Sequence, residues 1–194
     1  GNLDAYDVSD PNNIERLDFY RPEKTKNTPT IPHNTHYLDG FLITSWYTDG
    51  IVVVDGNKPD NLIPVAQYDT YIQDQFSYNG CWGAYPYLPS GLIIGADIQG
   101  WLFVIQPSYD RACYLEGTIN SEDQDIINNA SVEIIDPFLN LASSKSNGSY
   151  KTGFHASGTF DVLYTHPDYY DTIYTVELMH GEVTIQDVIM REKK

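Results

Sequence analysis

The 194-residue sequence has few cysteines, few basic residues and no long apolar run. Two cysteines cannot form the disulfide framework that stabilises small secreted domains, and the sequence leaves open whether Cys81 and Cys113 pair. Cys81 lies in an aromatic, glycine-rich segment, which predicts a buried, small hydrophobic residue. No stretch is apolar over the length that a membrane helix needs, so no transmembrane segment is expected.

Basic residues are scarce beside acidic ones, with 11 Lys and Arg against 27 Asp and Glu and a formal net charge of −16. The excess is evenly spread, because residues 1–113 and residues 114–194 each carry a net charge of −8. Nucleic acid requires a basic surface, so this composition excludes it as a partner. A uniformly acidic surface is typical of a well-solvated secreted protein.

What the first half does contain is an internal repeat. Asp-Val-Ser-Asp-Pro-Asn-Asn-Ile at 7–14 returns 48 residues later as Asp-Gly-Asn-Lys-Pro-Asp-Asn-Leu at 55–62, and the apolar run at 50–55 returns at 100–105. Short strands with a period of roughly 40 to 50 residues are typical of β-propeller blades. Helical periodicity is almost absent, so the predicted fold class is all-β.

Apolar runs bounded by Gly, Pro, Asn and Asp predict strands and tight turns. One complete four-stranded blade is expected over 33–68, with a hairpin turn at Asp39-Gly40. Another is expected over 81–105, with no fourth strand. Residues 1–110 would thus form about two and a half blades, whereas closed propellers have roughly four to eight. The sequence starts inside a repeat, so we expect an N-terminal truncation, with the missing blades upstream or in another chain.

Residues 114–190 have a different character. About seven short strands are expected in this stretch of roughly 80 residues, the last over 181–189, which predicts a small Greek-key β-sandwich. The expected organisation is therefore a partial β-propeller followed by a sandwich.

Several motifs in the first part are shared with one known group of proteins. They are Asp-Val-Ser-Asp-Pro at 7–11, His-Asn-Thr-His at 33–36, Trp-Tyr-Thr-Asp-Gly at 46–50, Asn-Gly-Cys-Trp-Gly at 79–83, Tyr-Pro-Tyr-Leu-Pro-Ser-Gly at 85–91 and Asp-Ile-Gln-Gly at 97–100. With these motifs, residues 3–105 resemble the LVIVD-repeat propellers called choice-of-anchor B proteins. The resemblance implies a secreted, surface-exposed propeller without a settled reaction.

The second part carries another set of motifs. They are Leu-Glu-Gly-Thr-Ile at 115–119, Ile-Asn-Asn-Ala-Ser-Val-Glu-Ile at 127–134, Asn-Gly-Ser-Tyr at 147–150, Gly-Thr-Phe-Asp-Val at 158–162 and His-Pro-Asp-Tyr-Tyr at 166–170. With them, residues 114–190 resemble a carboxypeptidase regulatory-like domain, which is a transthyretin-like sandwich. This implies a non-catalytic accessory module, and the two resemblances together imply a surface protein of Bacteroidetes-type bacteria.

Polar residues recur at the predicted blade turns. His33, Asp49 and Asp97, with His36 and Asn79 nearby, could hold a metal or ligand at the propeller mouth. The alternative is that these side chains hold the turns by hydrogen bonds to the backbone. On a strand, the two histidines would point to opposite faces, whereas in a loop they could act together. Catalytic motifs are absent, so no catalytic residue and no cofactor are predicted.

Aromatic residues also recur in both predicted blades. The set consists of Trp46, Tyr47, Trp82, Tyr85 and Tyr87. Such rings serve either as a stacking platform for a sugar or peptide or as packing between blades. We expect packing for Trp46 and Trp82, and exposure for Tyr85 and Tyr87.

These observations predict a non-catalytic, extracellular binding or adhesion protein at the cell surface. The propeller would recognise a protein or carbohydrate, and the sandwich would be an accessory module. Two alternatives stay open. One is a metal-dependent enzyme with its site at the propeller mouth, and the other is a structural subunit whose partner completes the propeller.

Overall fold

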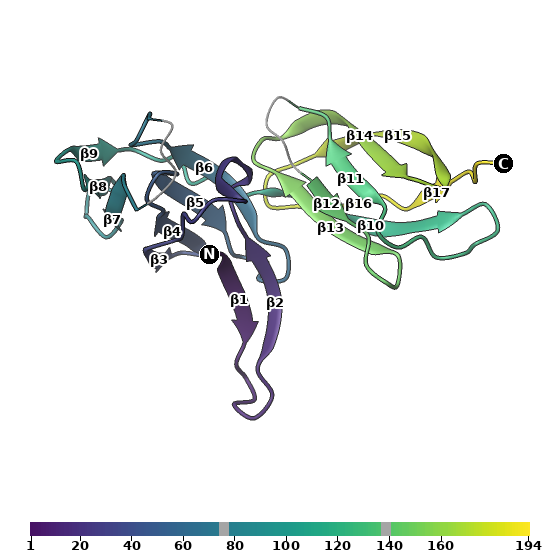
Figure 1. Cartoon of the computed structure of the whole chain (residues 1–194), viewed down its shortest axis with the longest axis horizontal. Coiled ribbons are helices and arrows are strands. Elements are labelled where there is room, and N and C mark those ends of the chain that lie inside the picture. The colour runs from purple at the N-terminus through teal and green to yellow at the C-terminus, as the bar shows by residue number, and fades with distance from the viewer. Residues whose placement is uncertain (74–77, 137–140) are drawn as a thin grey trace. The chain divides into compact units, whose positions relative to one another are not determined.

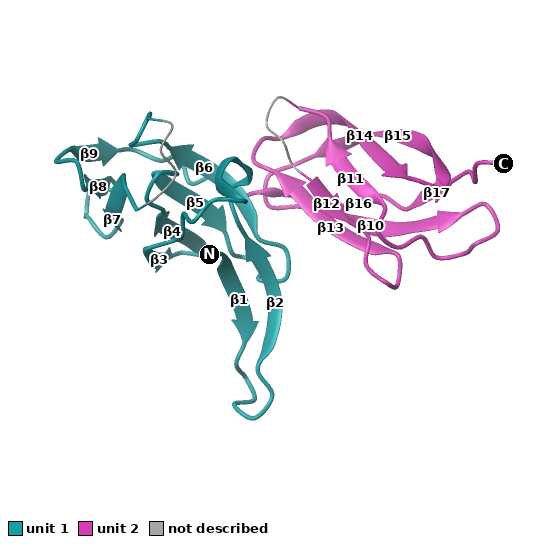
Figure 2. Cartoon of the chain, viewed as in Figure 1, with its two compact units in different colours: residues 1–110 teal, residues 111–194 magenta. Residues whose placement is uncertain are grey.

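A computed structural model describes residues 1–73, 78–136 and 141–194 (Figure 1). The prediction of an all-β chain is confirmed, since these residues form β-sheets, most of them antiparallel, and a single 3-10 turn, η1 (Glu23–Thr25). Two compact units are present, residues 1–110 and residues 111–194 (Figure 2). Within the described ranges, no helix has the length and apolar character needed to cross a membrane.

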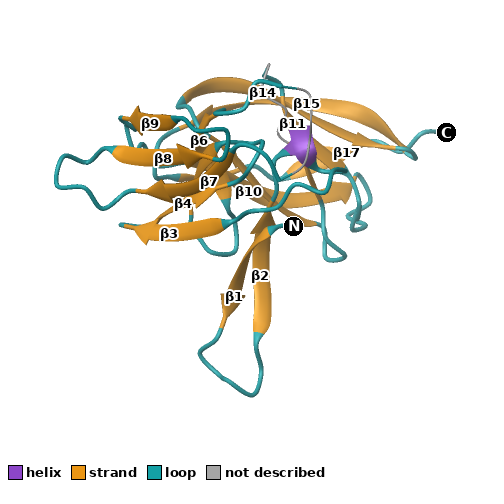
Figure 3. Ribbon diagram, turned by 60° about the vertical axis from the view of Figure 1, so that its left-hand side comes forward, coloured by secondary structure: helices purple, strands orange, loops and turns teal. Residues whose placement is uncertain are grey.

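Unit 1, residues 1–110, contains three sheets whose strands follow one another in sequence and pair antiparallel. The first is the hairpin of β1 (Leu3–Asp7) and β2 (Glu15–Tyr20). The second contains β3 (Asn34–Leu38), β4 (Phe41–Ser45), β5 (Ile51–Asp55) and β6 (Ile63–Tyr68). The third contains β7 (Cys81–Tyr85), β8 (Ile93–Asp97) and β9 (Leu102–Ile105). In Figures 1 and 3, the tip of the β1–β2 hairpin extends away from the other two sheets of this unit.

The sequence repeat has a structural basis in the turns. Asp7 and Asp55 end equivalent strands, and each carboxylate accepts a hydrogen bond from the backbone amide two residues later, at 2.8 Å and 2.9 Å. This Asx turn reverses the chain with local bonds alone. The expected hairpin turn at Asp39-Gly40 is confirmed, because both residues have positive φ, 47° and 86°, as a type I′ turn requires.

Alternate residues of β5 bury opposite faces of the second sheet. Val52 and Val54 point to one face, where they pack with Trp46 and with the β1–β2 hairpin. The hairpin residues in this contact are Leu3, Ala5 and Tyr20. A strand that is buried on both faces explains the continuous Ile-Val-Val-Val sequence at 51–54.

Ile51 and Val53 of β5 point to the other face and pack with the third sheet. The cluster contains Phe41, Ile43, Cys81, Ala84 and Ile93 as well, all at most 4% exposed. Strand β7 of the third sheet lies beside β3 and β4 of the second sheet (Figure 3). Unit 1 is therefore a stack of three sheets with the second sheet in the middle.

Unit 2, residues 111–194, packs two sheets around one core. One sheet contains β12 (Leu141–Ser143), β11 (Ser131–Ile134), β14 (Gly158–His166) and β15 (Tyr169–Leu178) in that order. In the other, β10 (Cys113–Ser121) pairs antiparallel with β13 (Ser149–Phe154) and parallel with β16 (Val183–Ile185) and β17 (Val188–Met190). In the core, the hydroxyls of Tyr150 and Tyr164 lie 2.9 Å apart.

The prediction of one continuous last strand over 181–189 was wrong, because two short strands occupy this segment. The backbone at Gln186 comes so near to β10 that a Cβ on Gly117 would lie 2.1 Å from the Gln186 carbonyl oxygen. Next to it, the Asp187 carboxylate accepts hydrogen bonds from the amide and hydroxyl of Thr118, at 2.9 Å and 2.8 Å. At this point, hydrogen bonds from Thr118 to a side chain thus take the place of the backbone hydrogen bonds between strands.

A substitution at Gly50 tests how tightly the turn between β4 and β5 packs against the C-terminal end of β6. Its φ is 75°, and a Cβ there would lie 2.1 Å from the Tyr68 carbonyl oxygen. Gly50→Ala should therefore lower the free energy of unfolding by more than the roughly 1–2 kcal/mol that a left-handed residue costs. Urea titration followed by tryptophan fluorescence measures this, because Trp46, Trp82 and Trp101 all lie in unit 1.

Gly91→Ala is the matched control. Gly91 has the same φ of 75°, but no atom would lie within 4 Å of its Cβ. Gly91→Ala should lower the free energy of unfolding only by the cost of placing a non-glycine residue in the left-handed region. Equal losses in the two variants would contradict the steric role of Gly50.

Candidate functional site

Aromatic rings gather where β3 and β7 of unit 1 adjoin. His33 lies against Trp82, with ring centroids 4.2 Å apart, and His36 lies edge-on to Tyr87 at 5.5 Å. We call the group the aromatic site; it consists of His33, His36, Tyr47, Trp82, Tyr85 and Tyr87. Three of its rings are half exposed: Trp82 at 51%, Tyr85 at 49% and Tyr87 at 45%.

Backbone contacts between the second and third sheets position this site. Tyr47 and Cys81 exchange two hydrogen bonds, at 3.1 Å and 2.9 Å, outside the regular strands. The close approach depends on Gly80, whose φ is 91° and whose Cβ would lie 2.4 Å from the Tyr47 carbonyl oxygen. Ser45 adds a hydroxyl donor to the Trp82 carbonyl at 3.2 Å. Tyr47 itself is only 6% exposed, so it packs against His33 and Trp82 and offers little surface to a ligand.

The predictions for the aromatic residues are confirmed in part. Trp46 is buried, edge-on to Tyr20 at 5.8 Å, and Tyr85 and Tyr87 are exposed as expected. The prediction that Trp82 packs between blades was wrong. A register shift between Cys81 and Gly83 removes Trp82 from the alternation of β7, so its indole lies on the surface against His33.

Asp97 and Asn79 act within turns. The Asp97 carboxylate accepts a hydrogen bond from the backbone amide of Gln99 at 2.8 Å. Asn79 donates to the Tyr71 hydroxyl at 3.2 Å and accepts from the Gln99 side chain at 3.1 Å. These contacts match the alternative in which such residues hold blade turns.

Asp49 lies in a buried polar cluster. Its carboxylate is fully buried and accepts a short hydrogen bond from the Thr25 hydroxyl, while Thr30 and Thr48 pair nearby at 3.1 Å. The second carboxylate oxygen has no hydrogen-bond partner in the described residues. Burial raises the pKa of Asp49 from its ordinary value of 3.8 to about 6, although the Thr25 hydrogen bond and Lys24 oppose this rise.

The structure does not assemble the metal site that the sequence left open. His33 and His36 each contact aromatic rings, Asp49 contacts threonine and Asp97 caps a turn. Across residues 1–73, 78–136 and 141–194, no three His, Cys, Asp or Glu side chains converge as a metal ion would require.

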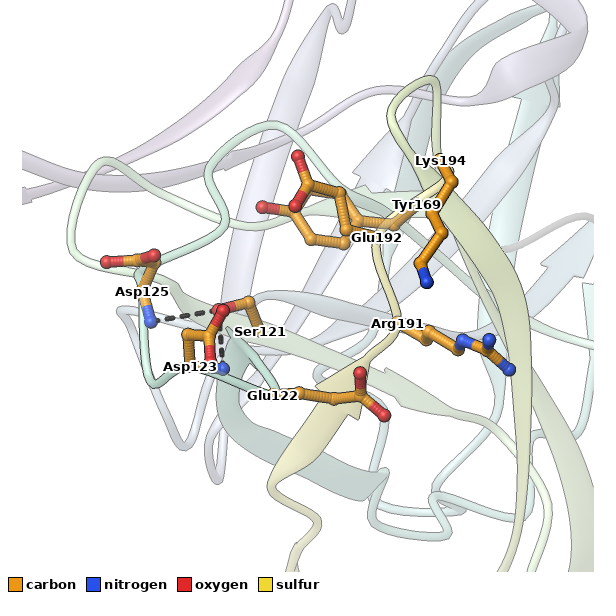
Figure 4. Close-up of a pocket in the computed structure, with 8 residues that line it drawn as sticks. All are labelled: Ser121, Glu122, Asp123, Asp125, Tyr169, Arg191, Glu192 and Lys194. Atoms are coloured by element: carbon orange, nitrogen blue, oxygen red, sulfur yellow. Dashed lines mark hydrogen bonds between the residues drawn. The ribbon is translucent and has the colours of Figure 1, made fainter.

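Unit 2 has a polar depression of about 270 Å³ near its C-terminal end (Figure 4). Its floor is a turn in which the Ser121 hydroxyl accepts hydrogen bonds from the amides of Asp123 and Asp125, at 3.2 Å and 3.0 Å. The remaining lining residues are Glu122, Tyr169, Arg191, Glu192 and Lys194. In Figure 4 the carboxylates are spread around the rim and do not converge on one point. The depression therefore offers less for recognition than the aromatic site.

Both cysteines are free and fully buried, one in each unit. The prediction that Cys81 is a buried small residue is confirmed. Burial raises the pKa of Cys81 to about 12 and that of Cys113 to about 11. Since the thiolate is the reactive form, neither side chain has the character of a nucleophile.

Sequence reasoning missed that the two histidines serve as ring partners. A spacing of three residues along an extended segment places each histidine opposite a different part of β7, where Trp82 and Tyr85 lie. The recurrence of aromatic residues in both repeats was the only sequence signal for this arrangement. It predicted the exposure of Tyr85 and Tyr87 but not that of Trp82.

Comparisons with known proteins leave the family open. No protein-family model matches the chain, and no curated protein matches it. A solved structure, that of the Bacillus anthracis TIE protein, matches 84% of this chain at 10% identity with a TM-score of 0.37. This chain spans 39% of that protein's length. A similarity at this level carries no information about function.

The buried carboxyl of Asp49 should make the stability of unit 1 depend on pH. Because its pKa is raised in the folded state, the folded protein retains this proton to higher pH than the unfolded chain does. The stabilisation is present below about pH 4 and is lost as the pH rises to about 6. It amounts to at most about 3 kcal/mol. Asp49→Asn should remove this slope in urea titrations followed by tryptophan fluorescence.

Asp10→Asn is the control, because it removes an exposed turn carboxylate from the same unit and keeps an acceptor for the Asn12 amide. It should retain the wild-type slope between pH 4 and 6. If Asp49→Asn also retained this slope, the inference that folding raises the pKa of Asp49 would be wrong.

Proposed function

We propose that this chain is a non-catalytic extracellular binding protein of the cell surface. In this proposal, residues 1–110 are the C-terminal blades of an LVIVD-type propeller of the choice-of-anchor B group. Residues 114–190 are a carboxypeptidase regulatory-like, Greek-key β-sandwich that acts as an accessory module. The stack of three consecutive antiparallel sheets and the two-sheet unit 2 are compatible with these assignments.

The observation that carries the proposal is the aromatic site. Exposed Trp and Tyr rings give a ligand a large, rigid contact area at little cost in conformational entropy. Here Trp82 is held on one side by His33, and the Tyr87 hydroxyl donates to the Tyr37 carbonyl at 2.8 Å. Rings fixed in this way need not be ordered when a ligand binds, which favours affinity.

The chemistry of the site favours a carbohydrate ligand. The apolar C–H face of a sugar ring packs on an exposed indole or phenol ring, while its hydroxyls remain available to polar edges. The chain's net charge of −16 disfavours acidic sugars, so the ligand class is neutral oligosaccharides. A peptide with exposed apolar side chains is the competing ligand.

The enzyme alternative lacks a comparable observation. A metal-dependent reaction at the propeller mouth would need His33, His36 and acidic side chains around one point, and the described residues do not provide this arrangement. The other alternative, a structural subunit whose partner completes the propeller, likewise rests on no observation of the described residues.

Trp82→Ala tests the proposal. The wild-type protein should bind neutral oligosaccharides on a glycan array, and the variant should lose at least about tenfold in affinity, which corresponds to about 1.4 kcal/mol of lost ring contact. Isothermal titration with the best array ligand measures this loss. Trp82→Phe should retain more of the affinity than Trp82→Ala, because it keeps a ring.

Trp101→Ala is the matched control, since Trp101 is also exposed, at 69%, and is not part of the aromatic site. It should bind as the wild type does. Loss of affinity in this variant equal to that of Trp82→Ala would argue against the aromatic site. Binding to peptides instead of glycans on parallel arrays would assign the competing ligand.

A further inference from the structure

One sheet of unit 2 has apolar side chains on the side that points away from the core. In β11, β14 and β15, the side chains of Val132, Val162 and Val176 point into the core. Successive side chains of a strand alternate between its two faces, which places the opposite set outward. We call the surface formed by Glu133, Leu141, Asp161, Leu163, Ile173 and Glu177 the outer face of unit 2.

The apolar members of the outer face lie in one row across the sheet. Leu163 pairs directly with Ile173 on one side and with Glu133 on the other, and Glu133 pairs with Leu141. Neighbouring strands are roughly 5 Å apart, so this row extends over about 15 Å. Ile173 and Leu141 are 57% and 45% exposed, and a partner that covers them gains the free energy of apolar burial.

The charges on the outer face are all negative. Within the described part of the chain, Glu133, Asp161 and Glu177 form no ion pair. The outward side of the other sheet differs, because Glu116 there pairs with Lys151 at 3.6 Å. No basic residue of unit 2 lies in β11, β12, β14 or β15. The basic residues of this unit are Arg111, Lys145, Lys151, Arg191, Lys193 and Lys194.

Two carboxylates adjoin Leu163 and repel each other. Glu133 pairs with Leu163, and Asp161 precedes Leu163 by two residues, so the two acids are diagonal neighbours about 7–8 Å apart. The Thr175 hydroxyl donates a hydrogen bond to the Asp161 carboxylate at 2.6 Å, which holds it in place. Salt screens charges incompletely at this separation. A cation supplied by a partner removes the repulsion while apolar groups beside it cover Leu163 and Ile173.

This combination of groups selects the class of partner. Nucleic acids and anionic membranes carry negative charge and are repelled. A second copy of the chain is disfavoured for the same reason, since each copy has a net charge of −16. Sugars pack on aromatic rings, whereas the apolar side chains of the outer face are aliphatic. A polypeptide with basic and apolar side chains complements both features.

We propose that the outer face of unit 2 is a docking surface for a basic polypeptide segment. Its Lys or Arg side chains pair with Glu133 and Asp161, and its apolar side chains pack on Leu163 and Ile173. Leu163 and Asp161 are two residues apart on one strand, about 7 Å, which is also the spacing of same-side residues in an extended partner. The segment therefore carries an apolar and a basic residue at positions i and i+2. This docking surface is separate from the aromatic site of unit 1.

A short peptide with repeating Leu-Ser-Lys-Ser tests the proposal on the intact chain. Isothermal titration should detect binding of this peptide. Peptides with Glu in place of Lys, or with Ser in place of Leu, should bind at least about tenfold more weakly, because each lacks one of the two complementary groups. In an amide ¹H–¹⁵N spectrum of the chain, the signals that shift on binding should be those of β11, β14 and β15.

Two substitutions on the outer face have matched controls in the same unit. Ile173→Thr and Glu133→Gln should each weaken peptide binding at least about fivefold, since one removes apolar surface and the other removes a charge. Ile185→Thr is the apolar control, because Ile185 is 64% exposed on β16 of the other sheet. Glu122→Gln removes an exposed carboxylate that lies outside the outer face. Both controls should bind the peptide as the wild type does.

The amide spectra of the variants also show whether they are folded, because signals away from the substitution should be unchanged. Trp82→Ala should bind the peptide with wild-type affinity, since Trp82 belongs to the aromatic site. Absence of binding by the wild-type chain would overturn the proposal. Amide shifts spread beyond the outer face, or equal losses from Ile185→Thr and Ile173→Thr, would overturn it as well.

Discussion

The alternation of β5 is the constraint on which unit 1 depends. Because successive side chains of a strand point to opposite faces, Val52 and Val54 bind the hairpin, and Ile51 and Val53 bind the third sheet. A shift of one residue in its pairing with β4 or β6 would exchange the two sets and disrupt both contacts at once. The fixed turns at Asp39-Gly40 and Gly50 prevent this shift, since their backbone conformations allow one register.

The aromatic site is a by-product of the same stacking. Joining the third sheet to the second requires the close approach of Tyr47 to Cys81, and this approach places Trp82 next to His33. The rings are therefore held by backbone that also stabilises the unit, and a ligand there would contact a rigid surface. Recognition and stability are coupled at this junction, whereas Trp101 lies outside it.

The strands and turns of unit 1 follow from local sequence, because β-branched runs and Asx turns act over a few residues. Which side chains face solvent follows only in part, since it depends on neighbours distant in sequence. Trp82 shows this, since it is the extra residue at a register shift in β7 and its indole lies on the surface. The same holds for Asp49, whose burial depends on Thr25 on a separate segment, and for the break at Gln186, which depends on β10. The candidate site was thus visible as residue types, and its geometry was not.

The parallel pairing of β16 and β17 with β10 separates the folding behaviour of the two units. Thr118 and Asp187 are 69 positions apart, so unit 2 joins its first strand to its last ones. Pairings that close such long loops slow folding, and they cannot form until the C-terminal residues have left the ribosome. In unit 1 each sheet is built from consecutive hairpins, which can form in the order of synthesis. Unit 1 should therefore mature earlier during translation, whereas unit 2 waits until residues 183–190 have emerged.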